Sequence, residues 1–168
     1  TTGNGNTATG VSALYSNTTG SNNAAIGLEA LSQNTSGQKN TANGAYALHN
    51  NVTSSNNTAT GYQALYNSTA GDNTAVGSNA LFSNTTGNSN TAAGSETLSS
   101  NTTGSTNTAF GRKALGANAD GGSNTAIGAY SLFGNTSGSS NTAAGVDALG
   151  SNSTGSQNVA VGREALYF

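Results

Sequence analysis

The strongest constraint on this chain is a short sequence unit that recurs at a nearly fixed spacing. The unit is clearest from Asn73 to Leu81, N-T-A-V-G-S-N-A-L, and it starts again at Asn90. Its first residue is asparagine in all ten copies: Asn6, Asn23, Asn40, Asn57, Asn73, Asn90, Asn107, Asn124, Asn141 and Asn158. These starts lie 17 residues apart, except that Asn73 follows Asn57 by 16. A fixed period of this size predicts a solenoid or another repeat architecture, so we treat residues 1–168 as one repeat array.

Large apolar residues are few, but they stay in phase with the repeat. Counted from its asparagine, every copy has Ala at position 3, Gly at position 5 and Leu at position 9. The leucines are Leu14, Leu31, Leu48, Leu65, Leu81, Leu98, Leu115, Leu132, Leu149 and Leu166. Leu, Ile, Val and Phe together supply only 23 of 168 residues, a composition typical of disorder. The net charge of only −2 and the regular leucine spacing argue for an ordered array instead.

The internal pattern of the unit favours strands over helices. Helical repeats use units of about 33 to 47 residues, and a 17-residue unit rich in Gly, Asn, Ser and Thr forms helices poorly. Positions 2 to 5 alternate in the period of a strand, and positions 8 to 10 predict a second short strand. Positions 12 to 17 have turn chemistry. We therefore predict an all-β protein, a β-solenoid of about ten 17-residue coils forming a rod on the order of 50 Å long.

Stacking of equal positions explains why they do not vary. Neighbouring coils lie about 4.8 Å apart, so the position-1 asparagines can bond amide to amide and the leucines can form an apolar spine. One buried Leu contributes only about 1.5–3 kcal/mol, whereas ordering each residue costs about 1.5 kcal/mol. We therefore expect the small Ala and Gly face to meet another chain, in a homotrimer or a filament.

The strand motif resembles that of a known family of surface proteins. Val159–Gly162, Ala24–Gly27 and Thr125–Gly128 read V-A-V-G, A-A-I-G and T-A-I-G. They are similar to the head repeat of trimeric autotransporter adhesins, the YadA-like left-handed β-roll. The full unit looks even more like the N-T-A-x-G-x-x-A-L arrays of phage tail-fibre-like and bacterial surface proteins. This resemblance implies a trimeric extracellular stalk or head, on a cell or virion surface, that presents a binding surface to a host receptor or glycan.

A second resemblance is to curli-type amyloid repeats, which carry G-x-x-N-x-A. The stretch Gly87–Ala92 reads G-N-S-N-T-A and fits that pattern. The paired glutamine positions of that family are missing, and the period here is shorter. A functional amyloid filament is therefore a further hypothesis for this chain.

The sequence offers little for catalysis or cofactor binding. His49 is the only histidine, and it occupies position 10, where other copies carry Tyr, Phe, Ser or Gly. Four of the six acids share position 7, which is typical of a solvated face. No cysteine, phosphate-binding glycine motif or repeated calcium motif is present. We expect no enzyme, no cofactor, no metal, no nucleic-acid partner for four scattered basic residues, and no membrane insertion by this segment.

Two features permit sharper alternatives. Threonine fills position 2 in eight copies, Thr7, Thr41, Thr58, Thr74, Thr91, Thr108, Thr125 and Thr142. If these side chains face outward they form a regular rank of the kind that orders water on ice-binding β-solenoids. Seven position-12 asparagines, from Asn17 to Asn152, open N-x-S/T triplets, which are glycosylation signals in secreted eukaryotic proteins but are also ordinary turn sequence. Our main hypothesis is a non-enzymatic extracellular fibre segment with an adhesive or spacer surface.

Overall fold

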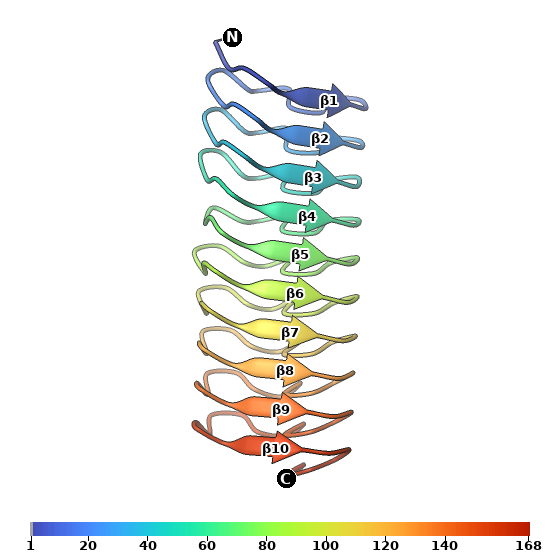
Figure 1. Cartoon of the computed structure of the whole chain (residues 1–168), viewed down its shortest axis with the longest axis vertical. Helices are drawn as coiled ribbons and strands as arrows, with labels where there is room; N and C mark the ends of the chain where they lie inside the picture. Colours follow the sequence, from blue (N-terminus) through green and yellow to red (C-terminus); the bar gives the residue numbers. More distant parts are fainter. Residues whose placement is uncertain (1) are drawn as a thin grey trace.

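The computed structural model describes residues 2–168 as a single stack of ten three-residue strands in one parallel sheet (Figure 1). The strands are β1 (Thr7–Thr9), β2 (Ala24–Ile26), β3 (Thr41–Asn43), β4 (Thr58–Thr60), β5 (Thr74–Val76), β6 (Thr91–Ala93), β7 (Thr108–Phe110), β8 (Thr125–Ile127), β9 (Thr142–Ala144) and β10 (Val159–Val161). Each strand pairs with the next one in sequence, and no helix occurs in residues 2–168. The predicted all-β solenoid is confirmed.

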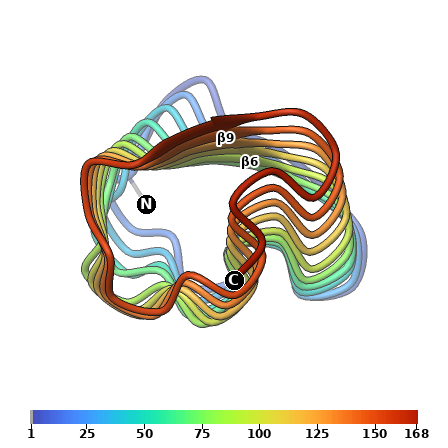
Figure 2. The same ribbon diagram turned by 90° about the horizontal axis from the view of Figure 1, so that it is seen from below.

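Equal repeat positions lie above one another throughout the stack. Ala8 pairs with Ala25, and Ala25 pairs with Ala42, so the small strand residue keeps its register. The register survives the one 16-residue repeat, where Ala59 still pairs with Ala75, because the missing residue is absorbed in the turn before β5. Each strand runs left to right at the front of Figure 1 and the chain returns behind while descending, which makes the solenoid left-handed (Figures 1 and 2).

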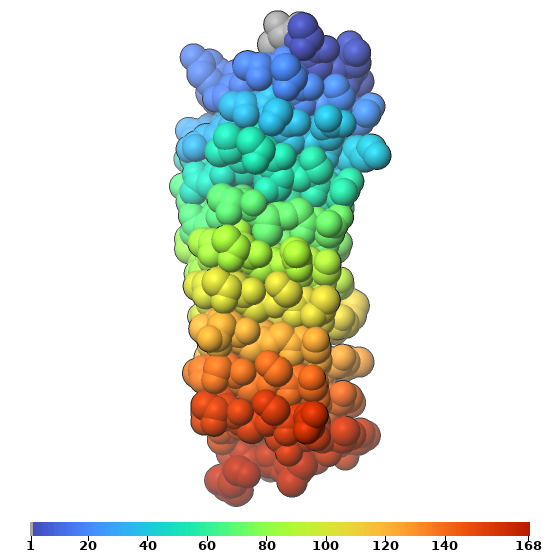
Figure 3. All heavy atoms as spheres, turned by 90° about the vertical axis from the view of Figure 1, so that its left-hand side faces the viewer, coloured from blue at the N-terminus to red at the C-terminus, as the bar shows by residue number. Residues whose placement is uncertain are grey.

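The coils form a continuous column, with the two ends of the chain at opposite ends of the rod (Figures 1 and 3). Ten strands at the usual spacing of about 4.8 Å give a column roughly 45 Å long. Figure 2 shows that the coils fan gradually about the long axis. We number the coils by their first residue, from coil 1 at Asn6 to coil 10 at Asn158.

The predicted second strand at positions 8 to 10 is wrong. This segment is a turn in every coil, and the ten ladder leucines have left-handed backbone φ angles between 50° and 53°. Position 7 is left-handed as well, with φ angles between 51° and 60°. The coils are nevertheless hydrogen-bonded here, since Leu48 N donates to Ala64 O at 3.0 Å and Asn50 N donates to Tyr66 O at 3.0 Å. The left-handed conformation costs about 1–2 kcal/mol per residue, which these bonds and the burial of leucine offset.

The interior holds one leucine and two alanines in most coils, with Thr97 and Ser131 in place of the second alanine in coils 6 and 8. Alanines 42, 59 and 75 at position 3, alanines 47, 64 and 80 at position 8, and the leucines of coils 2 to 8 are fully or almost fully buried within the single chain. Leu14 and Leu149 are nearly buried, whereas Leu166 in coil 10 is exposed. The expectation that the alanine face meets another chain is therefore wrong. Small residues are needed there because the coil closes tightly around its leucine.

Position-1 asparagines hold the coils together in a different way from the one expected. Asn40 Oδ1 accepts from the backbone N of Asn57 at 2.9 Å, and Asn90 Nδ2 crosses its own coil to Gly104 O at 2.9 Å. Amide-to-amide bonding occurs in this file only between Asn158 and Asn141, at 3.1 Å, within residues 2–168. In coils 1 to 9, each position-1 side chain thus closes its coil and ties the backbone of the next one.

The true amide ladder lies at position 12. Asn101 Nδ2 donates to Asn84 Oδ1 at 2.8 Å, and Asn118 Nδ2 donates to Asn101 Oδ1 at 2.8 Å. The same Nδ2 of Asn101 also reaches Gly104 O at 2.9 Å, so this carbonyl receives asparagine amides from both files. The two files therefore form one buried polar network beside the leucine spine.

Glycine at position 5 is required by close backbone approach. Gly94 has a φ of +135°, and a Cβ placed on it would lie 2.7 Å from the carbonyl carbon and oxygen of Gly111 in the next coil. A positive φ and a collision with backbone both exclude other residues, because neither neighbour can move independently of its own coil. The positive φ holds at all ten position-5 glycines and the close approach at nine of them, all but Gly162, which explains why this position is Gly throughout.

Candidate functional site

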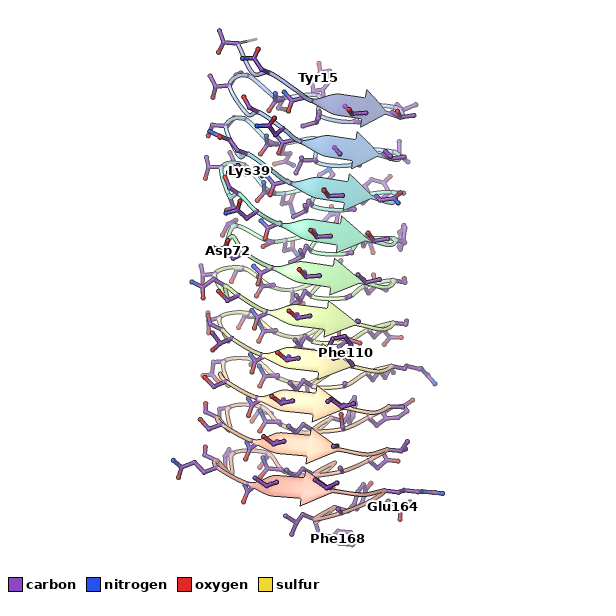
Figure 4. All side chains as sticks on the ribbon, in the orientation of Figure 1. Tyr15, Lys39, Asp72, Phe110, Glu164 and Phe168 are labelled. Carbon is purple, nitrogen blue, oxygen red and sulfur yellow. The ribbon has the colours of Figure 1, made fainter. Side chains whose placement is uncertain are left out.

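The outer face of the sheet carries the threonine rank. Because the position-3 alanines point inward, the threonines at position 2 point outward and are half-buried or exposed. The rank is unbroken over the seven strands from Thr41 to Thr142, while Ala24 interrupts it at β2 and Val159 ends it at β10. Figure 4 shows these side chains on the face turned to the viewer. Ice binding by this rank would require the outward orientation of these threonines.

A second file on the same face is more apolar and less regular. Position 4 includes Ile26, Val76, Phe110, Ile127 and Val161, all of which are exposed. Phe110 stands on the face near the end of β7, where it interrupts the flat surface (Figure 4). No residue of the ten strands is charged. The sheet face is therefore a long, uncharged and partly apolar strip, of the kind that marks interaction surfaces.

Aromatic side chains stack along a different edge of the rod. The rings of His49 and Tyr66, at position 10 of coils 3 and 4, lie 5.0 Å apart and nearly parallel. Phe82 in coil 5 continues the stack at 5.4 Å from Tyr66. Tyr46 packs against both His49 and Tyr66. The one-coil spacing matches the distance that stacked rings prefer, so equal positions build an aromatic ladder.

His49 is held in place by hydrogen bonds as well as by stacking. Its Nε2 lies 2.9 Å from Glu29 Oε2, and its Nδ1 lies 2.8 Å from Asn50 Oδ1. Elsewhere on this edge an ion pair joins Lys113 Nζ to Glu96 Oε2 at 3.3 Å. The position-7 acids are thus partly paired, in contrast to the fully solvated face that the sequence suggested. Asp147 and Glu164, which occupy position 7 of adjacent coils, line one hollow near the end of the rod.

Five of the seven position-12 asparagines that open N-x-S/T triplets lie where no glycan could reach them, whereas Asn17 and Asn152 near the two ends of the rod are half-buried. Asn34, Asn51, Asn84, Asn101 and Asn135 have no exposed surface, because their side chains form the interior ladder. Turn sequence is therefore the correct interpretation of the five buried triplets, with a structural role that the sequence analysis missed. The signal was available, because position 12 is asparagine in every complete coil except coil 4, which has Ser68.

The residues that the structure describes contain neither a cluster of metal ligands nor a membrane-spanning helix. Across residues 2–168, no group of three or more His, Cys, Asp or Glu side chains could hold a metal ion. The same residues include no helix that is both long and apolar enough to span a bilayer. Comparison with protein-family models, with curated proteins and with solved structures finds no match to this chain. The functional argument therefore starts from the surfaces of the rod.

Proposed function

We propose that this chain is a non-enzymatic structural segment of an extracellular fibre, on a cell or virion surface, which presents an adhesive or spacer surface. The observation that carries the proposal is the uninterrupted tie between coils. In the turn of coil 6, Thr102 O accepts from three backbone N atoms of coil 5, those of Thr85, Thr86 and Gly87, at 2.9, 3.1 and 3.4 Å. Backbone bonds to this turn carbonyl recur between most adjacent coils, and between coils 3 and 4 Thr69 O accepts from Ser54 Oγ instead. Together with the other backbone bonds between coils, they make a rod that resists bending and proteolysis, because few backbone groups are free to open.

The outer positions suit a display role. Positions 6, 7, 10 and 11 project from the rod and vary among the coils, while the interior positions do not. A solenoid tolerates such variation, because each outer side chain contacts only its neighbours. This arrangement separates the part that makes the rod from the part that contacts a receptor.

Side-by-side packing of copies, most simply as a homotrimer, uses the sheet face in this proposal. The strip formed by positions 2 and 4 is uncharged, and it exposes Ile26, Val76 and Ile127 in file. Burying exposed apolar side chains contributes about 25 cal/mol per Å² of apolar surface removed from water. Thr side chains between them can bond across an interface or to water. Three such strips meeting at a common axis would leave the varied positions on the outside.

The assembly is tested by mass measurement under native and mildly denaturing conditions. We expect a trimer that persists in mild denaturant, and we expect the Ile127→Lys variant to release monomers because it buries a charge in the strip. Thr103→Lys is the matched control, since Thr103 is exposed in the turn at positions 12 to 17 and does not belong to the strip. A wild-type chain that is monomeric at every concentration contradicts side-by-side assembly. Seeded filament growth with a thioflavin response would favour the amyloid hypothesis instead.

Ice binding remains a second candidate because the threonine rank faces outward. Seven adjacent strands present Thr at the same position, at a spacing of about 4.8 Å. The mixed position-4 file and the projecting Phe110 weaken the regularity that such a surface needs. Thermal-hysteresis and ice-recrystallisation assays separate the two functions: activity that is lost in Thr91→Lys and kept in Thr103→Lys would favour ice binding over the fibre proposal.

A further inference from the structure

The aromatic ladder at position 10 has a gap in the middle of the rod. Coils 3 to 5 carry His49, Tyr66 and Phe82 there, coil 6 carries Ser99 and coil 7 carries Gly116. The ladder resumes with Phe133 of coil 8, whose ring leans over coil 7. A Cβ placed on Gly116 would lie 3.1 Å from the Cδ2 and Cε2 atoms of Phe133. Phe133 therefore leans toward the level of coil 7, and between coils 3 and 8 only the level of Ser99 lacks a ring.

The gap coincides with a hollow in the surface. A space of about 420 Å³ lies between Phe82 at one end, the position-7 side chains Gln63, Asn79 and Glu96 on one wall, and Ser99 and Ser100 on the floor. It continues into a second hollow of about 220 Å³ that reaches Lys113 and Phe133. The two hollows share Glu96, Ser99 and Ser100, so they form one trough that ends on an aromatic ring at each side.

The size of the gap fits one six-membered ring. Phe82 lies at the level of coil 5 and Phe133 leans to the level of coil 7, so about two coil spacings, roughly 10 Å, separate their levels. A ring that contacts carbon atoms on both sides needs about 3.5–4.0 Å on each side. A flat or chair-shaped ring of ordinary thickness can therefore enter at the level of Ser99 and continue the stack.

The rim of the trough is polar and carries no net charge. The side chains of Gln63, Asn79 and Ser100 have no hydrogen-bond partner within residues 2–168, whereas the carboxylate of Glu96 and the ammonium of Lys113 form an ion pair with each other. These groups offer amide, hydroxyl and carboxylate atoms around the edge of whatever enters. A neutral ligand with apolar faces and a ring of hydroxyl groups matches both the aromatic ends and this rim, whereas an aromatic side chain would leave the rim unpaired.

We propose that the trough binds a neutral pyranose unit of a glycan, inserted between Phe82 and Phe133 at the level of Ser99. The C–H faces of the sugar contact the two rings, and its hydroxyls bond to Asn79 and Ser100, while Gln63 in coil 4 is left for a further unit of the glycan. The inference rests on the proposed adhesive role, because it supplies a ligand for the display surface. The site itself lies within one chain, so its occupation does not depend on how the copies assemble.

The experiment compares binding of four probes, the methyl pyranosides of glucose, galactose, mannose and N-acetylglucosamine, by saturation-transfer difference NMR, with an array of neutral glycans as the second measurement. We expect at least one probe to bind. Ser99→Tyr should reduce its affinity at least tenfold, because the new ring occupies the gap. The fold accepts the change, since Tyr15, Tyr66 and Tyr167 already occupy position 10. Ser151→Tyr, on an exposed serine of coil 9, is the matched control and should bind as the unmodified chain does.

Three results would overturn the proposal. One is the absence of binding by the four pyranosides and by the array, a second is binding that Ser99→Tyr leaves unchanged, and a third is tighter binding of methyl glucuronide or of p-cresol than of any neutral sugar. Native mass is measured on the same samples. Intact assemblies that bind no sugar would contradict the glycan site alone. Sugar binding by a strictly monomeric chain would contradict side-by-side assembly and support the glycan site.

Discussion

Truncation of one asparagine in the position-12 ladder should destabilise the rod far more than its small size suggests. Asn101 is fully buried and makes three side-chain hydrogen bonds: to Asn84 Oδ1 at 2.8 Å, to Gly104 O at 2.9 Å, and from Asn118 Nδ2 at 2.8 Å. In Asn101→Ala all three are lost. Gly104 O keeps its bond from Asn90, and Asn118 keeps its bond to Gly121, but Asn84 Oδ1 has no other donor.

The magnitude follows from that inventory. Three net hydrogen bonds contribute about 3 kcal/mol, and leaving one acceptor buried without a partner costs a further ~1–2 kcal/mol. We therefore expect the free energy of unfolding to fall by about 4 kcal/mol, in guanidinium denaturation followed by circular dichroism. Asn88→Ala is the control, because this exposed side chain makes no hydrogen bond within residues 2–168, and it should change stability by less than about 0.5 kcal/mol.

A double-mutant cycle tests the ladder itself. Asn84 and Asn101 are direct partners, so the two alanine substitutions should couple, with an interaction energy of about 0.5–3 kcal/mol. Amide hydrogen exchange shows which coils lose stability in each variant, because repeat arrays can open locally and need not unfold in one step. If the free energies of unfolding of Asn101→Ala and Asn88→Ala differ by less than about 0.5 kcal/mol, the buried amides do not hold the coils together and the reasoning fails.

Three further predictions concern the interior and the turns. Leu98→Ala should lower the free energy of unfolding by about 3–4 kcal/mol in the same denaturation assay, against a small effect for the exposed Leu28→Ala, and equal effects would contradict a leucine spine. Gly94→Ala should prevent folding as judged by circular dichroism, because its Cβ would meet backbone at 2.7 Å. The control Gly162→Ala, with the nearest atom at 3.9 Å, should lose only the stability that its positive φ costs. Similar behaviour of the two variants would contradict the close-approach argument. Ser68→Asn should stabilise the rod by about 1 kcal/mol, because it offers a donor to Asn51 Oδ1, the buried atom without a partner within residues 2–168. The control is Ser153→Asn, at an exposed serine. A Ser68→Asn variant no more stable than this control would show that the shortened turn of coil 4 does not admit the amide.

Local sequence rules failed where the backbone takes unusual conformations. Leucine is not expected in left-handed backbone, so A-L-x at positions 8 to 10 indicated a strand. Leu48 adopts a φ of 52° because the coil must reverse direction between the strand and the position-12 ladder within a few residues. Closure of the coil and the bonds to neighbouring coils decide this conformation, and neither is visible in a nine-residue pattern.

The candidate sites were predictable only in part. The threonine rank was evident from the repeat, but its outward direction depended on which strand face the closed coil turns inward. The aromatic gap at Ser99 could be noticed in the list of position-10 residues. The lean of Phe133 over Gly116, which reduces the gap to one ring, could not, because it depends on side-chain packing between coils.

The sequence alone determined that equal positions stack, since a nearly constant period with invariant Asn, Ala, Gly and Leu admits few other architectures. It also determined the rod's length, because each coil adds one strand spacing. The tertiary structure decided the left-handed turn, the burial of alanine inside a single chain, and the exchange of roles between the two asparagine files. Those features follow from closing a 17-residue ring around one leucine, where each backbone polar group must find a partner in its own coil or in an adjacent one.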